Sequence, residues 1–319
     1  MRWLDPFIAA MLGTIAVAAV LPARGAGADV ADLVATLAVA LLFFLHGARM
    51  APRTALAGAR HWRLHVATMA TTFVLFPLLG LLAVVLTPDL LSTDLYRGLL
   101  FLCAAPSTVQ SSIAFTSIAH GNVPAAVFSA SFSNLAGIVL TPLLAVALLG
   151  GSGHVAFDAG SVGVVVLQLL VPFAAGQLSR RWTAGWLDRH RRLTSLVDRG
   201  SILLVVYAAF SAGVVAGIWH AVSPPRLAVL LAVVVALLGV VLAATYGLGR
   251  LLRFSRADRV TLLFCGSKKS LATGLPMATV LFGTQGLGLL ILPIMAFHQV
   301  QLIVCTAIAR RWGATAVPD

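Results

Sequence analysis

Acidic side chains are scarce in this sequence, and glutamate is absent altogether. Its ten acidic residues are all aspartates, and charged residues make up only 10% of the 319 positions, against 60% for hydrophobic residues. A soluble globular domain carries about 25% charged residues, so this composition, with a mean hydropathy of +1.00, excludes that class. We expect an all-α polytopic membrane protein whose surroundings are a lipid bilayer.

Cysteine is also rare, and no enzyme signature is present. Cys103, Cys265 and Cys305 lie in apolar segments, at spacings that fit neither a metal site nor a disulfide framework. The sequence holds no HExxH motif, no GxSxG motif, no phosphate-binding loop and no paired aspartates within an apolar segment. We therefore expect neither an enzyme nor a resident metal or cofactor.

Lysine is the third deficit, since Lys268 and Lys269 are the only lysines among 22 basic residues. The net charge of +12 could indicate a nucleic-acid partner. The arginines, however, lie in short segments between apolar stretches, which is typical of membrane proteins. We expect no nucleic-acid partner, and the two lysines stand out because they lie inside an apolar stretch.

Ten apolar stretches are long enough to cross a bilayer as helices. The loops after the second, sixth and eighth stretches are rich in arginine, whereas the opposite loops hold only Arg24, Arg97 and Arg226. Under the positive-inside rule this places both termini in the cytoplasm, as for a protein of the bacterial inner (cytoplasmic) membrane. The predicted spans are residues 6–22, 33–47, 66–87, 98–119, 125–149, 162–178, 202–219, 227–248, 260–282 and 287–308.

These spans form two groups of five, in residues 1–150 and 151–319, within a single transmembrane domain that covers residues 1–319. Because each group has an odd number of helices, the second group is inverted relative to the first. The fourth and ninth spans hold matching places, and polar or helix-breaking residues interrupt both. The prediction is two inverted five-helix repeats with discontinuous fourth and ninth helices.

Polar side chains collect at both interruptions. In the fourth span they follow a proline, which frees a backbone carbonyl, and in the ninth they surround lysines that cost at least about 2.5 kcal/mol each at a helix centre. The alternatives are serines that bond to their own helix and lysines that snorkel to the membrane surface. The candidate binding residues are Pro106, Ser107, Thr108, Gln110, Ser111 and Ser112, and then Ser267, Lys268, Lys269, Ser270 and Thr273.

The spans that follow each interruption also carry polar residues. Ser131 and Asn134 in the fifth span could line the same site or simply hold helices together. His298 and Gln299 in the tenth are candidates for lining a polar cavity, because an imidazole in hydrocarbon needs a partner.

Two motifs, CAAPSTVQSSIAFTSIAHGNVPAAVFSAS and CGSKKSLATGLPMA, resemble those of the bile acid:sodium symporter family, in its bacterial branch. The resemblance covers essentially the whole chain. It implies ten helices in two inverted repeats, a panel and a core domain with the substrate cavity between them, and fourth and ninth helices that cross where they unwind.

The chain departs from this family at the sodium sites. Ser111 and Ser112 stand where the resemblance implies a Ser-Asn pair. The family's glutamate falls on Phe264 or Cys265, and its glutamine falls on Lys268. At low effective dielectric, the repulsion energy between an ammonium group and a nearby sodium ion is on the order of several kcal/mol. We therefore expect this chain to share the fold of the family but not its sodium sites. The coupling ion is left open: it is a proton, sodium or none.

Together these features favour a secondary transporter that moves a small organic anion by alternating access, because fixed positive charge attracts an anion. Two alternatives stay open: an ordinary sodium-coupled symporter of the bile-acid type, and a non-transporting membrane regulator with the same fold. Because successive helical residues point about 100° apart, Lys268 and Lys269 should differ in role. One would take the place of the relatives' cation, and the other would face the substrate or the carbonyl end of a half-helix.

Overall fold

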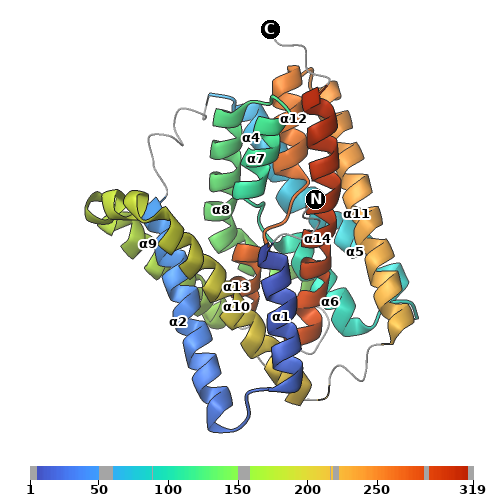
Figure 1. Ribbon diagram of the computed structural model, residues 1–319. Coiled ribbons are helices and arrows are strands. Elements are labelled where there is room, and N and C mark those ends of the chain that lie inside the picture. Colours follow the sequence, from blue (N-terminus) through green and yellow to red (C-terminus); the bar gives the residue numbers. More distant parts are fainter. Residues whose placement is uncertain are drawn as a thin grey trace. The chain divides into compact units, whose positions relative to one another are not determined.

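A computed structural model describes residues 6–49, 60–87, 89–149, 159–215, 217, 223–283 and 287–314. Regular structure in these ranges is helical, without strands (Figure 1). The chain ends that the topology prediction concerns, residues 1–5 and 315–319, lie outside the described residues, as does the predicted repeat boundary at residues 150–151.

The chain divides into two compact units. Unit 1 comprises Met1–Met50, Asp158–Ser223 and Leu275–Ile291, and unit 2 comprises Ala51–Phe157, Pro224–Gly274 and Leu292–Asp319.

Unit 1 is built around a close approach of two helices, α2 and α9, which run side by side (Figure 1). A Cβ atom added to Gly47 would overlap the carbonyl oxygen of Phe173, and one added to Gly176 would overlap that of Phe44. Small residues allow this backbone contact between membrane helices. The helices of this unit are α1 (Pro6–Val20), α2 (Ala26–Arg49), α9 (Ala159–Arg189) and α10 (Arg191–Val215).

The arginine-rich segment after residue 178 differs from expectation. It was predicted to be a loop, but α9 continues to Arg189 and α10 begins at Arg191, so nearly all of it is helical. Arginine, leucine and alanine are good helix formers. A fall in hydropathy shows where a helix leaves the lipid, but the helix itself can continue into water. An ion pair between Arg49 and Asp198 ties the end of α2 to α10.

Unit 2 contains the breaks of both interrupted helices. Ala105 is extended, with ψ of 151°, as expected for the residue before a proline, and this ends the first half-helix. Ser92 and Ser255 cap the starts of α6 and α12 by accepting hydrogen bonds from Leu95 N and Asp258 N. The elements are α4 (Trp62–Ala70), the π turn η1 (Thr71–Leu75), α5 (Phe76–Leu82), the 3-10 turn η2 (Ala83–Leu86), α6 (Thr93–Ala104), α7 (Gln110–Ile118), α8 (Val123–Leu149), α11 (Pro224–Leu251) and α12 (Arg256–Gly266), with α13 (Leu271–Phe282) and α14 (Leu287–Ala314) crossing the unit boundary.

Within the described residues, six helical segments are each long and apolar enough to cross a membrane. The remaining predicted spans correspond to the 15-residue α1, to α9, and to the broken pairs α6–α7 and α12–α13. The ten-span arrangement therefore stays a prediction. The six segments are Ala26–Arg49, Trp62–Leu86, Val123–Leu149, Arg191–Val215, Pro224–Leu251 and Leu287–Ala314.

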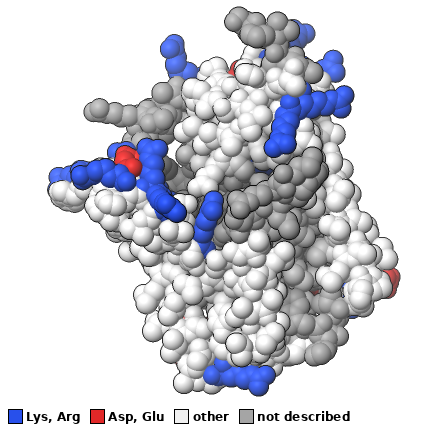
Figure 2. All heavy atoms as spheres, viewed as in Figure 1, with Lys and Arg blue, Asp and Glu red and all other residues white. Residues whose placement is uncertain are grey.

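The described surface fits a membrane setting. On the face drawn in Figure 2, uncharged residues cover most of the surface, and basic side chains occur in small groups. Large hydrophobic side chains such as Val85, Leu178 and Ile303 are more than two-thirds exposed. Extensive exposed apolar surface marks contact with a membrane or a partner.

Candidate functional site

The two helix interruptions of unit 2 are joined by direct hydrogen bonds. Ser270 N donates to Pro106 O at 2.8 Å, which links the main chains of the two breaks. Ser107 Oγ donates to Cys265 O at 2.6 Å. Because the last carbonyls of a helix have no partner within it, the first break supplies a donor that the end of α12 lacks.

Helix α8 supports the first break from the side. Asn134 Nδ2 donates to Ser107 O at 2.6 Å, and Ser107 N donates to Ser133 Oγ at 3.1 Å. The sequence left open whether the polar residues of the fifth span line a site or hold helices together. Ser133 and Asn134 bond to the broken backbone, while Ser131 is half-buried and takes no part in these hydrogen bonds.

Lys269 is completely buried, and its ammonium group is fully hydrogen-bonded. Its Nζ donates to the carbonyl oxygens of Thr72 at 2.8 Å, Cys103 at 2.7 Å and Ala105 at 2.6 Å. Nζ also lies 4.2 Å from the centre of the Phe76 ring. An ammonium has three protons to donate, so every donor is used, and two of the acceptors belong to the carbonyl end of α6.

The third acceptor exists because of the π turn η1. Phe76 N donates to Thr71 O, one residue further along than in an α-helix. In this register the donor to Thr72 O would be residue 77, which is a proline and has no N–H. The carbonyl of Thr72 is thus left free inside a membrane helix, and Lys269 supplies the missing donor.

The main chain of Lys269 is held as firmly as its side chain. Gln301 on α14 accepts from Lys269 N at 2.9 Å and donates to Lys269 O at 2.8 Å. His298 lies 3.0 Å from the same amide nitrogen of Gln301. Gln299 is half-buried, and its Nε2 finds no hydrogen-bond partner in the part of the chain that the structure describes.

Lys268 is equally buried, but its surroundings are aromatic. Its Nζ lies 3.5 Å from the centre of the Phe115 ring and 5.6 Å from that of Phe264. Across residues 6–314, leaving aside the undescribed gaps, no hydrogen-bond acceptor meets this nitrogen. Contact with ring faces stabilises a desolvated cation by about 2 kcal/mol, less than its desolvation costs.

The other polar residues of the first break have unequal positions. Ser112 is completely buried and donates to Phe264 O at 3.1 Å. Ser111 is half-buried and lies 3.2 Å from the hydroxyl of Thr108, while Gln110 is exposed. Sequence reasoning treated all four alike, whereas only Ser112 reaches the second break.

In the second break the smaller polar residues mostly serve the backbone. Ser267 Oγ donates to Leu263 O at 2.5 Å, and Ser270 Oγ accepts from Thr273 N at 3.2 Å, which caps the start of α13. The hydroxyl of Thr273 is buried, and no partner for it occurs among the described residues.

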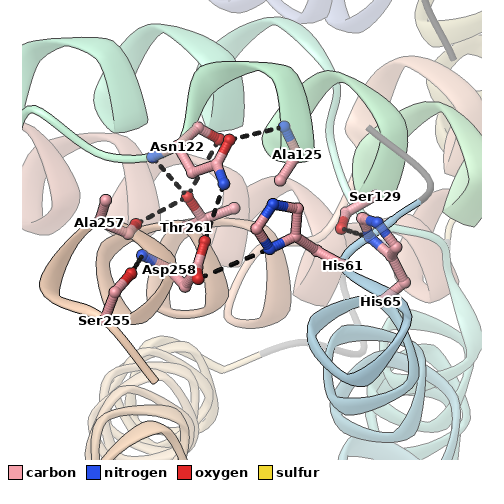
Figure 3. Close-up of polar contacts among 9 residues, drawn as sticks. All are labelled: His61, His65, Asn122, Ala125, Ser129, Ser255, Ala257, Asp258 and Thr261. Carbon is pink, nitrogen blue, oxygen red and sulfur yellow. Dashed lines mark hydrogen bonds and ion pairs between the residues drawn. The ribbon is translucent and has the colours of Figure 1, made fainter. Parts of the chain in front are cut away.

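A separate polar cluster of unit 2 fastens the connection between α7 and α8 to α12 (Figure 3). Asn122 Nδ2 donates to Asp258 Oδ1 at 2.8 Å, and the same carboxylate lies 3.7 Å from His61 Nδ1. Beside it, His65 Nδ1 and Ser129 Oγ are 2.7 Å apart and join α4 to α8. No residue predicted to bind substrate belongs to this cluster, which the sequence analysis did not identify.

Two further features escaped sequence reasoning. Gln301 was not among the predicted site residues, and no sequence pattern separates it from Gln299, which was. The acceptors of Lys269 are main-chain oxygens, which every residue has, so no residue type in the sequence identifies them. A proline inside the third span does predict a free carbonyl nearby.

Comparison with known proteins shows the family of this chain. Residues 5–314 match the family model of the SBF-like CPA transporter family. The chain belongs to the SBF-like CPA transporter family. It is therefore a multi-pass membrane protein of a transporter family, and the resemblance to bile acid:sodium symporters is confirmed.

Three relatives align with most of this chain. The sequence is 51% identical to "Uncharacterized protein PA2026" of Pseudomonas aeruginosa, over 97% of this chain and 93% of that protein. It is 48% identical to "Putative symporter YfeH" of Escherichia coli, over 98% and 93%. It is 30% identical to "Sodium/bile acid cotransporter 7" of Danio rerio, over 84% and 80%. The last two names are those of a putative symporter and a cotransporter, which supports transport as the activity of the SBF-like CPA family.

Proposed function

We propose that the protein is a secondary active transporter, a symporter of the bacterial inner membrane, that moves a small organic anion by alternating access. In this proposal ten spans form two inverted five-helix repeats, and the fourth and ninth helices cross at the breaks. The hydrogen bonds between the two breaks support the crossing. The division into two compact units supports alternating access, which needs bodies that move relative to each other.

The observation that carries the anionic substrate is the unpartnered ammonium group of Lys268. A cation buried without a counter-ion or acceptor is strongly unfavourable, and such residues in membrane proteins mark binding or relay sites. An anion that reaches Lys268 during the transport cycle would supply the missing partner. Lys269 has no such need, because three carbonyl oxygens already accept its protons.

Other polar residues of the two breaks have supporting roles in this proposal. Ser107, Ser112, Asn134, Ser267 and Ser270 hold the breaks in shape through hydrogen bonds to backbone groups. Four of the buried polar atoms that lack partners among the described residues belong to predicted site residues and are candidates for contact with substrate: Lys268 Nζ, Thr273 Oγ1, Gln299 Nε2 and Asn134 Oδ1.

The test is a thermal-stability screen of purified protein against a panel of small carboxylates, sulfates and sulfonates. A ligand that binds the folded state raises the Tm. We expect at least one anion to stabilise the wild type and to have no effect on Lys268→Met, while Leu178→Ala, at an exposed site outside the breaks, responds as the wild type does. Binding unchanged in Lys268→Met would remove this lysine from the site.

A sodium-coupled symporter of the bile-acid type is the alternative that the relatives' names favour. In that case the transport of the same anion, once found, would require sodium in reconstituted vesicles. A regulator that transports nothing would bind no solute in the screen and would tolerate Lys268→Leu in a cellular assay.

The proposed orientation has its own test. Both termini should be cytoplasmic under the positive-inside rule. A reporter that is active only in the periplasm should be silent when fused after Arg311, and a strong signal there would contradict the ten-span topology.

A further inference from the structure

The surroundings of Lys269 resemble an ion-binding site more than an ordinary salt bridge. Its ammonium group contacts three main-chain carbonyl oxygens at 2.6–2.8 Å. No ion pair of Lys269 with a carboxylate occurs in the described part of the chain. Within the described residues, the positive charge is therefore stabilised by neutral groups.

These three carbonyl groups come from places where the backbone is already broken. Cys103 O and Ala105 O belong to the carbonyl end of α6, which carries a partial negative charge. Thr72 O is released by the π turn and by Pro77. In transporters, the carbonyl ends of half-helices and unwound backbone bind sodium ions and protons, and carbonyl rings replace the water of hydration around potassium.

We propose that the carbonyl oxygens of Thr72, Cys103 and Ala105 form a monovalent-cation site, and that the ammonium group of Lys269 is its tethered occupant. The Phe76 ring, 4.2 Å from Nζ, closes another side of the group. The hydrogen bonds of Gln301 to Lys269 N and O hold the main chain of Lys269 in place, and with it the base of the side chain that carries the ammonium group.

This inference deepens the proposed function, on which its meaning for transport rests. A dissolved ion binds and leaves during a transport cycle, but a tethered one cannot leave. The site would therefore contribute a constant positive charge next to the lysine proposed to meet the substrate, without a requirement for a sodium ion. The existence of the cation site itself can be tested without any transport measurement.

The experiment is chemical replacement of the side chain. In Lys269→Ala most of the lysine stem and its ammonium group are gone, while the main-chain oxygens remain. We expect its Tm in detergent to be well below that of the wild type. Adding methylammonium, which reproduces the end of the lysine side chain, should raise it by at least about 3 °C. Choline, at the same concentration, is too bulky for three converging oxygens and should have no effect.

Sodium, potassium and ammonium, tested one by one as chlorides against choline chloride, would show which ion the empty site prefers. Lys268→Ala is the matched control, because its missing ammonium has no acceptors in the described structure, so its Tm should not respond to methylammonium. A Lys269→Ala variant whose Tm is the same in all five salts would overturn the inference, as would an equal response of Lys268→Ala.

The wild type provides a second measurement if Lys269→Ala is not recovered in folded form. Its cation site is already filled, so its Tm should be the same in sodium and choline. A clear rise in sodium alone would contradict the inference. If the anion screen fails while methylammonium still restores Lys269→Ala, the proposed substrate is wrong and the cation site stands.

Discussion

Lys268 and Lys269 are adjacent, both are completely buried, and yet their surroundings are opposite in kind. Around Lys269 three carbonyl oxygens accept every proton of the ammonium group, whereas Lys268 faces two aromatic rings and no acceptor among the described residues. A satisfied buried cation stabilises the fold that surrounds it. An unsatisfied one weakens the fold, which points to a use outside folding.

Lys269→Met should have the largest effect on stability. Methionine matches the length of the stem but leaves three buried carbonyl groups unpaired, at about 1–3 kcal/mol each. We expect a Tm drop of at least about 6 °C, given 2–4 °C per kcal/mol, or failure to recover folded protein. Thermal unfolding followed by far-UV circular dichroism would measure it. A variant as stable as the wild type would show that Lys269 does not hold the breaks together.

Gln301→Leu should come second, because it tests how the main chain of Lys269 is held. Without this amide, Lys269 N and O lack their side-chain partner. We expect the free energy of unfolding to fall by about 2 kcal/mol or more. Gln299→Leu is the matched control, two residues away on α14, with an amide nitrogen that lacks a described partner. Equal destabilisation of the two variants would contradict the assignment of Gln301.

Ser112→Ala should have a smaller effect, near 1 kcal/mol, the usual net contribution of one hydrogen bond. Ser112 Oγ donates to Phe264 O and joins the two breaks. Ser111→Ala, at the half-buried neighbour whose hydroxyl contacts only that of Thr108, should leave the Tm within about 1 °C of the wild type, because this contact does not join the two breaks. A larger fall in Tm for Ser111→Ala than for Ser112→Ala would contradict the assignment of Ser112 as the residue that joins the two breaks.

Lys268→Met should change stability least and function most. It removes a contact with Phe115 of about 2 kcal/mol and relieves a desolvation penalty of similar or greater size. We expect the Tm to stay within a few degrees or to rise. The same protein should lose the stabilising response to anions. A fall in Tm as large as that of Lys269→Met would mean that both lysines are structural.

The membrane class, the two breaks and the lysine pair could be predicted from the sequence, because each follows from composition or from a residue with one strong local effect. Pro106 removes a backbone donor wherever it stands. Paired lysines in an apolar stretch are unfavourable in any fold. The two different environments of Lys268 and Lys269 were expected only from the 100° turn between neighbours.

The partners of the lysines could not be predicted, since they depend on contacts between distant segments. Lys269 is 197 residues from Thr72 and 166 from Cys103, and it contacts their carbonyl oxygens, an atom type that every residue has. The π turn depends on how Phe76 N pairs with Thr71 O, which periodicity does not reveal. The helical arginine-rich link between α9 and α10 was missed because charge suggested a loop.

Sodium replacement in reconstituted vesicles tests the central claim most directly, namely that a fixed internal cation takes the place of a bound ion. Uptake of an anion found in the stability screen would be measured at fixed pH in sodium chloride and in choline chloride. The account predicts equal initial rates for the wild type in the two salts. A strict sodium requirement, with Lys268 and Lys269 both in place, would contradict it and restore the ordinary symporter mechanism.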